Sequence, residues 1–242
     1  MKKLKKFLCL ALVLCLMVPV ALMLSACGPT TIEVSTFDEL KQALEGKNDI
    51  IKLTSDIDVT ATLKVTRKVT LDMNGKTLSN SQAIWSIADK NDWSIISVRE
   101  NGNLIINGNG KISTLNEDCY ALDVMDGGNL RIEDGEFVGN VSAVYAFDGH
   151  VDIKGGKYSI QQLNDNNVEG PYGLTINIYN NNPDKNGVRL LEEKATIAIT
   201  GGEFNKFDPT DKTDNKVDDL VPQGYKAVLK EGTTDVYVVV AE

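Results

Sequence analysis

The feature that most constrains the fold of this chain is a short repeat, in which apolar and polar residues alternate on either side of a turn. The copies occupy residues 96–106, 122–132, 144–153 and 174–199, with a looser one around residues 71–73. Apolar residues at every second position predict strands that bury one face. Recurrence at such short intervals predicts a stack of similar units, because one unit alone cannot bury its apolar face.

A third short strand follows in each unit, and a glycine with a charged residue after it introduces that strand. These glycines are Gly75, Gly110, Gly135, Gly156 and Gly202, separated by 35, 25, 21 and 46 residues. The shorter intervals fit one coil, and the longer ones fit a coil that carries a loop. Three strands per coil, with Gly or Asn at corners that need a positive φ, predict an all-β fold, a right-handed parallel β-helix.

Stacked coils would turn the inward residues of successive units into continuous ladders. We expect one ladder to contain Val98, Val124, Ala146 and Ile176. We expect a second ladder to contain Ile106, Ile132, Ile153 and Ile199. The third strands carry Phe137, Tyr158 and Phe204 at equivalent positions, which predicts an aromatic stack.

The two ends of such a stack need protection, because an open end exposes unpaired backbone groups. Thr36 and Glu39 form the sequence pattern of a capping box, which predicts a helix that starts after Thr36 and ends at Gly46. Its apolar face would consist of Phe37, Leu40, Ala43 and Leu44. We expect this helix to cover the first coil. At the far end, residues 224–241 predict a terminal β-hairpin.

The N-terminal segment predicts export and lipid anchoring. Residues 1–6 carry four lysines and residues 7–24 carry no charge, which is typical of a signal peptide. Leu24-Ser25-Ala26-Cys27 is similar to the bacterial lipobox, in which the cysteine accepts a diacylglycerol. We therefore expect residues 1–26 to be removed, Cys27 to be lipidated, residues 27–30 to form a tether, and residues 31–242 to form a single domain. An uncleaved signal anchor is the alternative.

These expectations place the mature protein outside the cytoplasm, attached to a bacterial membrane at the cell surface through the lipid on Cys27. Without residues 1–26 the 25 basic residues fall to 21 against 34 acidic ones, which leaves a net charge of −13. Such a chain repels nucleic acid, so we expect no nucleic-acid partner. The mature domain keeps only Cys119, which excludes an internal disulfide and a cysteine-based zinc site.

Several segments resemble a known family. They are residues 37–57, residues 69–76, Gly201-Gly202-Glu203-Phe204, and the ending from Pro222 to Val238. They are similar to the first coils and the closing segment of pectin-lyase-like β-helix domains of bacterial surface lipoproteins. The resemblance implies the same parallel β-helix. It implies no single function, because that fold serves in lyases, hydrolases, adhesins and passive stalks.

Few catalytic residues of the family carry over to this chain. The only histidine is His150, which we expect in a surface turn, and Asp218-Asp219 falls in a polar loop. Of the four arginines, only Arg99 falls beside acidic residues on the first strand of a coil. We therefore expect a non-catalytic protein, with a polysaccharide lyase or glycoside hydrolase as the alternative and a passive cell-surface scaffold as the second alternative.

The best candidate for a ligand-binding surface is the outward side of the first strands. It would present Arg99, Asp123, Tyr145 and Tyr179. Tyrosine rings offer flat apolar faces to sugar C–H groups, and polar side chains pair with hydroxyls. This pattern predicts binding of glycans, with a host or neighbouring surface protein as the other partner class. Exposed aromatic residues on strands are also ordinary, so the alternative is a surface with no ligand.

Three acidic residues predict a calcium site on the same side of the stack. Glu100, Asp126 and Asp148 follow the first strands and would stack about 4.8 Å apart. Carboxylates at that spacing repel each other, and a hard cation would relieve the repulsion. The alternative is that these residues are solvated turn formers.

Overall fold

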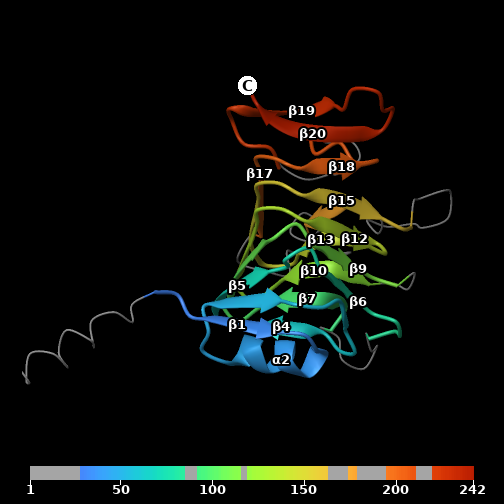
Figure 1. Ribbon diagram of the computed structural model, residues 1–242. Coiled ribbons are helices and arrows are strands. Elements are labelled where there is room, and N and C mark those ends of the chain that lie inside the picture. The colour runs from blue at the N-terminus through green and yellow to red at the C-terminus, as the bar shows by residue number, and fades with distance from the viewer. Residues whose placement is uncertain (1–27, 85–91, 116–118, 163–173, 179–194, 211–219) are drawn as a thin grey trace, which may run out of the picture. The chain divides into compact units, whose positions relative to one another are not determined.

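The computed structural model describes residues 28–84, 92–115, 119–162, 174–178, 195–210 and 220–242 (Figure 1). Residues Thr31–Glu242 form one compact unit, distinct from residues 1–30. The buried hydrophobic core runs from Val34 to Val239, so this unit holds its own core and is expected to fold without residues 1–30. The predicted signal peptide and Cys27 lie outside the described residues. In the described ranges, no helix has both the length and the apolar character needed to cross a membrane.

The unit is mostly β, with extensive parallel sheets. Sheet A orders β1 (Thr31–Val34), β2 (Ile50–Leu53), β5 (Lys68–Asp72), β8 (Asn103–Asn107), β11 (Gly128–Ile132), β14 (Gly149–Ile153) and β17 (Thr196–Ile199). Sheet C orders β16 (Ile176–Ile178), β13 (Ser142–Ala146), β10 (Tyr120–Val124), β7 (Ser94–Val98) and β4 (Leu63–Val65). Every strand pair in these two sheets is parallel.

Sheet B ends in an antiparallel hairpin. It orders β19 (Tyr225–Leu229), β20 (Val236–Ala241), β18 (Glu203–Asn205), β15 (Lys157–Ile160), β12 (Glu136–Gly139), β9 (Lys111–Ser113), β6 (Thr77–Ser79) and β3 (Ile57–Asp58). Strand β20 pairs antiparallel with both β18 and β19, and the remaining pairs are parallel. The terminal hairpin that the sequence predicts is confirmed.

The inward ladders are largely confirmed. In sheet A the column of Leu71, Ile106, Ile132, Ile153 and Ile199 is in register and at most 1% exposed. The aromatic stack also forms. The ring centroids of Phe137 and Tyr158 are 5.2 Å apart, those of Tyr158 and Phe204 are 5.0 Å apart, and both pairs are nearly parallel.

One register prediction is wrong. Ile176 pairs with Val144, and Ala146 pairs with Ile178 instead. A shift of two residues leaves the same face of the strand inward, so the apolar alternation alone could not distinguish the two pairings. In sheet B, Thr77 pairs with Lys111, so Lys76 and not Gly75 lies beside Gly110.

The helix α2 (Phe37–Glu45) forms as predicted. The Thr36 hydroxyl accepts the Glu39 N–H at 3.3 Å, and the Glu39 carboxylate accepts the Thr36 N–H at 3.2 Å. These two bonds complete the capping box and satisfy backbone donors that the helix leaves open. Leu40, Ala43 and Leu44 are buried, and the helix contacts β1, β2 and β4 (Figure 1).

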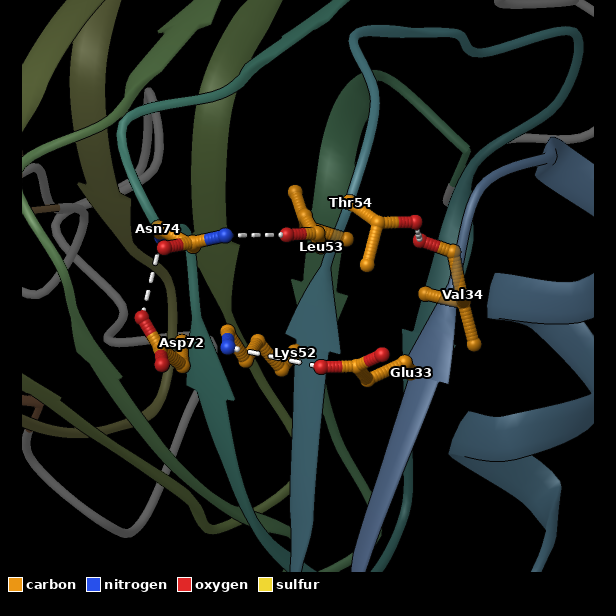
Figure 2. Close-up of polar contacts among 7 residues, drawn as sticks. All are labelled: Glu33, Val34, Lys52, Leu53, Thr54, Asp72 and Asn74. Carbon is orange, nitrogen blue, oxygen red and sulfur yellow. Dashed lines mark hydrogen bonds and ion pairs between the residues drawn. The ribbon is translucent and has the colours of Figure 1, made fainter.

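Polar side chains tie the first strands of sheet A together (Figure 2). The Asn74 side-chain amide donates to the Leu53 carbonyl at 2.9 Å, and the Thr54 hydroxyl donates to the Val34 carbonyl at 3.0 Å. Asn74 has φ 47°, a conformation that asparagine tolerates better than most residues. The corner that follows β5 is therefore built around an asparagine, as the β-helix prediction requires.

Candidate functional site

The candidate site lies on the outward side of sheet C. Ser97, Asp123 and Tyr145 stand side by side on β7, β10 and β13. The residues before and after each of them belong to the buried core, so these three side chains point to the opposite face. Arg99 directly follows β7. We call Ser97, Arg99, Asp123 and Tyr145 the Asp123 cluster.

The expectation that Arg99 and Asp123 lie on an open surface is wrong. Arg99 is 6% exposed and Asp123 is 2% exposed. Every residue of β7 and β10 is buried, so both faces of these strands are covered. Alternation along a strand predicts which residues point away from the core, but not whether other atoms pack over them. Tyr145 is partly exposed, and Tyr179 lies outside the described residues.

The guanidinium of Arg99 is held by neighbours on its own side of the sheet. Its Nε and Nη2 atoms donate to the Ser97 hydroxyl oxygen at 2.9 and 2.7 Å. Its Nη1 atom lies 3.5 Å from Asp92 Oδ1, and Asp92 also pairs with Lys64 Nζ at 3.0 Å. The buried cation is therefore compensated by an acid at the rim of the site, as a charge in a low-dielectric environment requires.

Asp123 is the most strongly perturbed acid of the site. Burial raises the pKa of its carboxyl to about 6, against the opposing effects of the Ser97 hydroxyl and then the Arg99 guanidinium. In the part of the chain that the structure describes, its Oδ1 atom has no hydrogen-bond partner. A buried carboxyl that titrates near neutral pH and has one unsatisfied oxygen is a common feature of binding and catalytic sites.

A row of aromatic rings adjoins the Asp123 cluster. The ring centroids of Tyr120 and Tyr145 are 4.8 Å apart, and those of Tyr145 and Phe147 are 6.4 Å apart. The Trp93 carbonyl accepts the Tyr120 N–H at 2.8 Å, and the Trp93 side chain is 39% exposed. Tyr145 and Phe147 are partly exposed. The site thus combines partly accessible rings with buried polar groups.

Sequence reasoning missed Tyr120 as a member of this site and Trp93 as its backbone partner. Trp93 directly precedes β7, and alternation along β10 groups Tyr120 with the inward Leu122 and not with Asp123. The signal that could have found them is the adjacency of Trp93 to Asp92, an acid that pairs with Arg99. Parallel pairing of β7 and β10 then brings Tyr120 beside Ser94 and Trp93.

The three predicted calcium ligands do not form a cluster. Glu100 and Asp126 adopt positive φ values of 53° and 51°, which are typical of tight turns. One carboxylate oxygen of Asp148 accepts the Gly127 N–H at 2.8 Å. Across the described ranges, no group of three or more His, Cys, Asp or Glu side chains gathers closely enough to hold a metal ion. The geometry favours the turn-forming alternative, because Glu100 and Asp126 occupy turn positions and the Asp148 carboxylate binds a turn N–H.

His150 also differs from its prediction. It lies within β14 and not in a turn. Its Nδ1 atom is 2.6 Å from the Thr196 hydroxyl oxygen, and its Nε2 atom is 3.3 Å from Asp152 Oδ1. The His150 and Asp152 side chains are 44% and 30% exposed. Water competes for all three groups, so this arrangement does not resemble a sheltered catalytic triad.

A groove follows the corners between sheets A and B. This groove has a volume of about 470 Å³, and successive glycines, among them Gly135, Gly156 and Gly202, line its floor. A Cβ atom on Gly156, whose φ is 96°, would lie 3.1 Å from the Tyr158 hydroxyl. The aromatic stack therefore requires glycine here. Ion pairs of 2.7 Å, Lys111–Glu136 and Lys230–Glu203, balance the charge around the groove.

Comparisons with protein-family models, with curated proteins and with solved structures give no match.

Proposed function

We propose that residues 31–242 form a right-handed parallel β-helix with three strands per coil, of the pectin-lyase-like type. Support comes from the chain order, in which strands pass repeatedly from sheet C to sheet A to sheet B, as in β7, β8 and β9. In this proposal α2 covers the first coil and the β19–β20 hairpin closes the last one. The helix then protects the first coil against edge-to-edge aggregation, while the hairpin covers the last coil and places β19 at the end of the sheet.

We further propose that the protein is a lipoprotein, held outside the cytoplasm of a bacterium by lipid on Cys27. The Leu24–Cys27 sequence supports this proposal. Mass spectrometry of the mature N-terminus tests it. The expected result is a chain that begins at Cys27 and carries acyl groups, together with release of the Cys27→Ser variant from the membrane fraction. An unmodified chain that retains residues 1–26 would support the signal-anchor alternative.

For the mature domain we propose non-catalytic binding of a glycan at the Asp123 cluster and its aromatic row. The observation that carries this proposal is the juxtaposition of partly exposed rings, Tyr145 and Phe147, with the buried Asp123 carboxyl. Rings of this kind stack on the apolar faces of sugars. In the described part of the chain Asp123 Oδ1 has no hydrogen-bond partner, and because it is buried, a sugar hydroxyl can supply the missing bond only when the atoms that cover it move aside. A partner protein that inserts a polar side chain is the other ligand class.

A glycan array with residues 28–242 tests this proposal. We expect binding that the Tyr145→Ala variant weakens roughly tenfold or more, because it removes the stacking ring. Tyr237→Ala is the matched control, since Tyr237 lies on β20 and outside the cluster. If the folded protein binds no glycan, the proposal fails and the passive scaffold becomes the better interpretation.

One observation favours a second candidate, a polysaccharide lyase or glycoside hydrolase. Asp123, with a pKa of about 6, has the properties of a general acid or base. Asp123 is 2% exposed and Arg99 is engaged with Ser97 and Asp92, so neither group is placed to act on a substrate. Incubation with polysaccharides, followed by assays for new reducing ends and unsaturated products, distinguishes the two. Cleavage that Asp123→Asn abolishes would establish the enzyme.

A further inference from the structure

The last strand of sheet B has one open edge. Strand β19 stands at the end of the sheet order and, among the described residues, pairs only with β20, which lies between it and β18 (Figure 1). The β19–β20 hairpin is antiparallel, so backbone groups alternate between the two sides of the strand. This edge lies far along the chain from the Asp123 cluster and is independent of the proposed glycan function.

The register identifies which backbone groups face the open edge. Lys230 donates its N–H to the Val236 carbonyl at 2.8 Å, and Glu242 donates its N–H to the Gly224 carbonyl at 3.0 Å. Even-numbered residues of β19 therefore bond to β20. By the same alternation, the N–H and C=O groups of Ala227 and Leu229 point away from β20. Within the described chain these groups pair with no other strand.

The side chains beside this edge are unusually apolar for a surface. Val228 is 36% exposed, Leu229 is 49% exposed and Val240 is 39% exposed. Of the four large hydrophobic residues that are exposed in the described part of the chain, these are three. Tyr225 and Ala227 alternate with Val228 and pack against the core, so one face of the strand is held in place. An apolar strand that is fixed in this way and has free backbone groups is a template for strand addition.

We propose that β19 pairs antiparallel with β19 of a second copy of this chain, with the two-fold axis at Ala227. In this register Ala227 faces Ala227 of the other copy, and Tyr225 faces Leu229. Ala227 and Leu229 have both backbone groups on the open side, so the facing Ala227 residues form a hydrogen-bonded pair. Tyr225 contributes only its carbonyl, as the acceptor for the Leu229 N–H of the other copy, because its own N–H donates to the Pro222 carbonyl at 3.2 Å. Lys226 faces Val228, so no like charges meet. The strand is thus complementary to itself in geometry, charge and apolar character.

A symmetric pair also explains how an apolar edge is tolerated. Isologous pairing occupies both open edges and leaves none for a third chain, so the assembly stops at a dimer. A heterologous pairing would continue into a fibre. The Val228 and Val240 side chains lie on the same face of the hairpin, because Val228 is opposite Val238 and Lys226 is opposite Val240. Pairing would extend this apolar strip across the two copies.

Cysteine pairing tests the register directly with residues 28–242. Lys226 and Val228 would form a non-hydrogen-bonded pair, with Cα atoms about 4.5 Å apart, within the range of a disulfide. An equimolar mixture of Lys226→Cys and Val228→Cys chains is expected to form a disulfide-linked dimer under mild oxidation. Each variant alone is the control, because identical positions lie farther apart. Equal cross-linking of single variants and mixture would overturn the register.

Sedimentation velocity tests the dimer without a cross-link. Ala227→Pro removes an N–H that the hairpin does not use, so it should abolish the dimer and leave the melting midpoint nearly unchanged. Ala227→Ser retains the N–H and should remain dimeric. If Ala227→Pro does not fold, the mixture of Lys226→Cys and Val228→Cys chains still tests whether β19 pairs with β19. A chain that stays monomeric up to about 1 mM, or a dimer that Ala227→Pro preserves, would overturn the proposal.

Discussion

Replacing Asp123 by asparagine tests the electrostatics of the candidate site. Asparagine keeps the shape and the acceptor oxygen of the side chain but cannot ionise. The carboxyl is 2% exposed, and burial raises its pKa to about 6 from the usual 3.8. The charged groups around it are Arg99, which favours the carboxylate, and Asp92, which disfavours it. The variant removes the titration and leaves both neighbours in place.

The expected effect depends on pH. The folded chain holds the Asp123 proton more tightly than the unfolded chain, because the folded pKa lies above the unfolded one. The contribution of Asp123 to stability is therefore largest below about pH 4 and is lost as the pH rises through 6. A pKa difference of about two pH units corresponds to about 3 kcal/mol. The stability of Asp123→Asn relative to the native chain should rise by up to that amount between pH 4 and pH 7.

Urea unfolding of residues 28–242, followed by circular dichroism at several pH values, measures this difference. Comparison of the variant with the native chain at each pH cancels the titration of all other acids. The Ser97→Ala variant provides a second arm. It removes a hydroxyl that favours the Asp123 carboxylate, so the pH range of the loss should move upward.

Two results would refute the reasoning. A stability difference between Asp123→Asn and the native chain that stays constant from pH 4 to pH 7 would mean that Asp123 is not desolvated. A difference that changes in the opposite direction would mean that Arg99 dominates over burial and holds the carboxylate ionised. Either outcome would remove the perturbed acid from the argument for a functional site.

Two further substitutions probe the corners of the stack and the helix. Gly156→Ala should destabilise the fold by more than 1 kcal/mol, because φ is 96° and the new Cβ would lie 3.0 Å from the Gly135 carbonyl oxygen. Gly75→Ala is its control in urea unfolding: φ is 70° but no atom lies within 4 Å, so an equal or larger loss there would contradict the packing argument. Thr36→Ala should cost about 1 kcal/mol through loss of the N-cap, and an unchanged urea midpoint would show that the helix does not depend on it.

Local chemistry explains why much of the fold could be predicted. Apolar alternation fixes the inward face of a strand, so the Ile106, Ile132 and Ile153 ladder follows from the sequence. A capping box acts within four residues, so the start of α2 could also be read from the chain. Register is less local. Ile176 and Ile178 satisfy the same alternation, and only the pairing of β16 with β13 decides between them.

The candidate site depended more on tertiary structure. The sequence grouped Arg99, Asp123 and Tyr145 on one side of the strands, and the parallel register does bring Asp123 beside Tyr145. The sequence also predicted a stack of acids that could bind calcium. In the structure two of these acids occupy turns and the third accepts a turn N–H.

By itself the sequence determined which residues face inward, where the helix begins, and which strands repeat, because these follow from the period of the pattern and from contacts between near neighbours. Only the tertiary structure decided that Arg99 and Asp123 are buried, that Trp93 and Tyr120 join them, and that one edge of β19 is open. The physical reason is that burial and edge exposure depend on segments far apart in the chain, and those segments set the desolvation that shifts the pKa of Asp123.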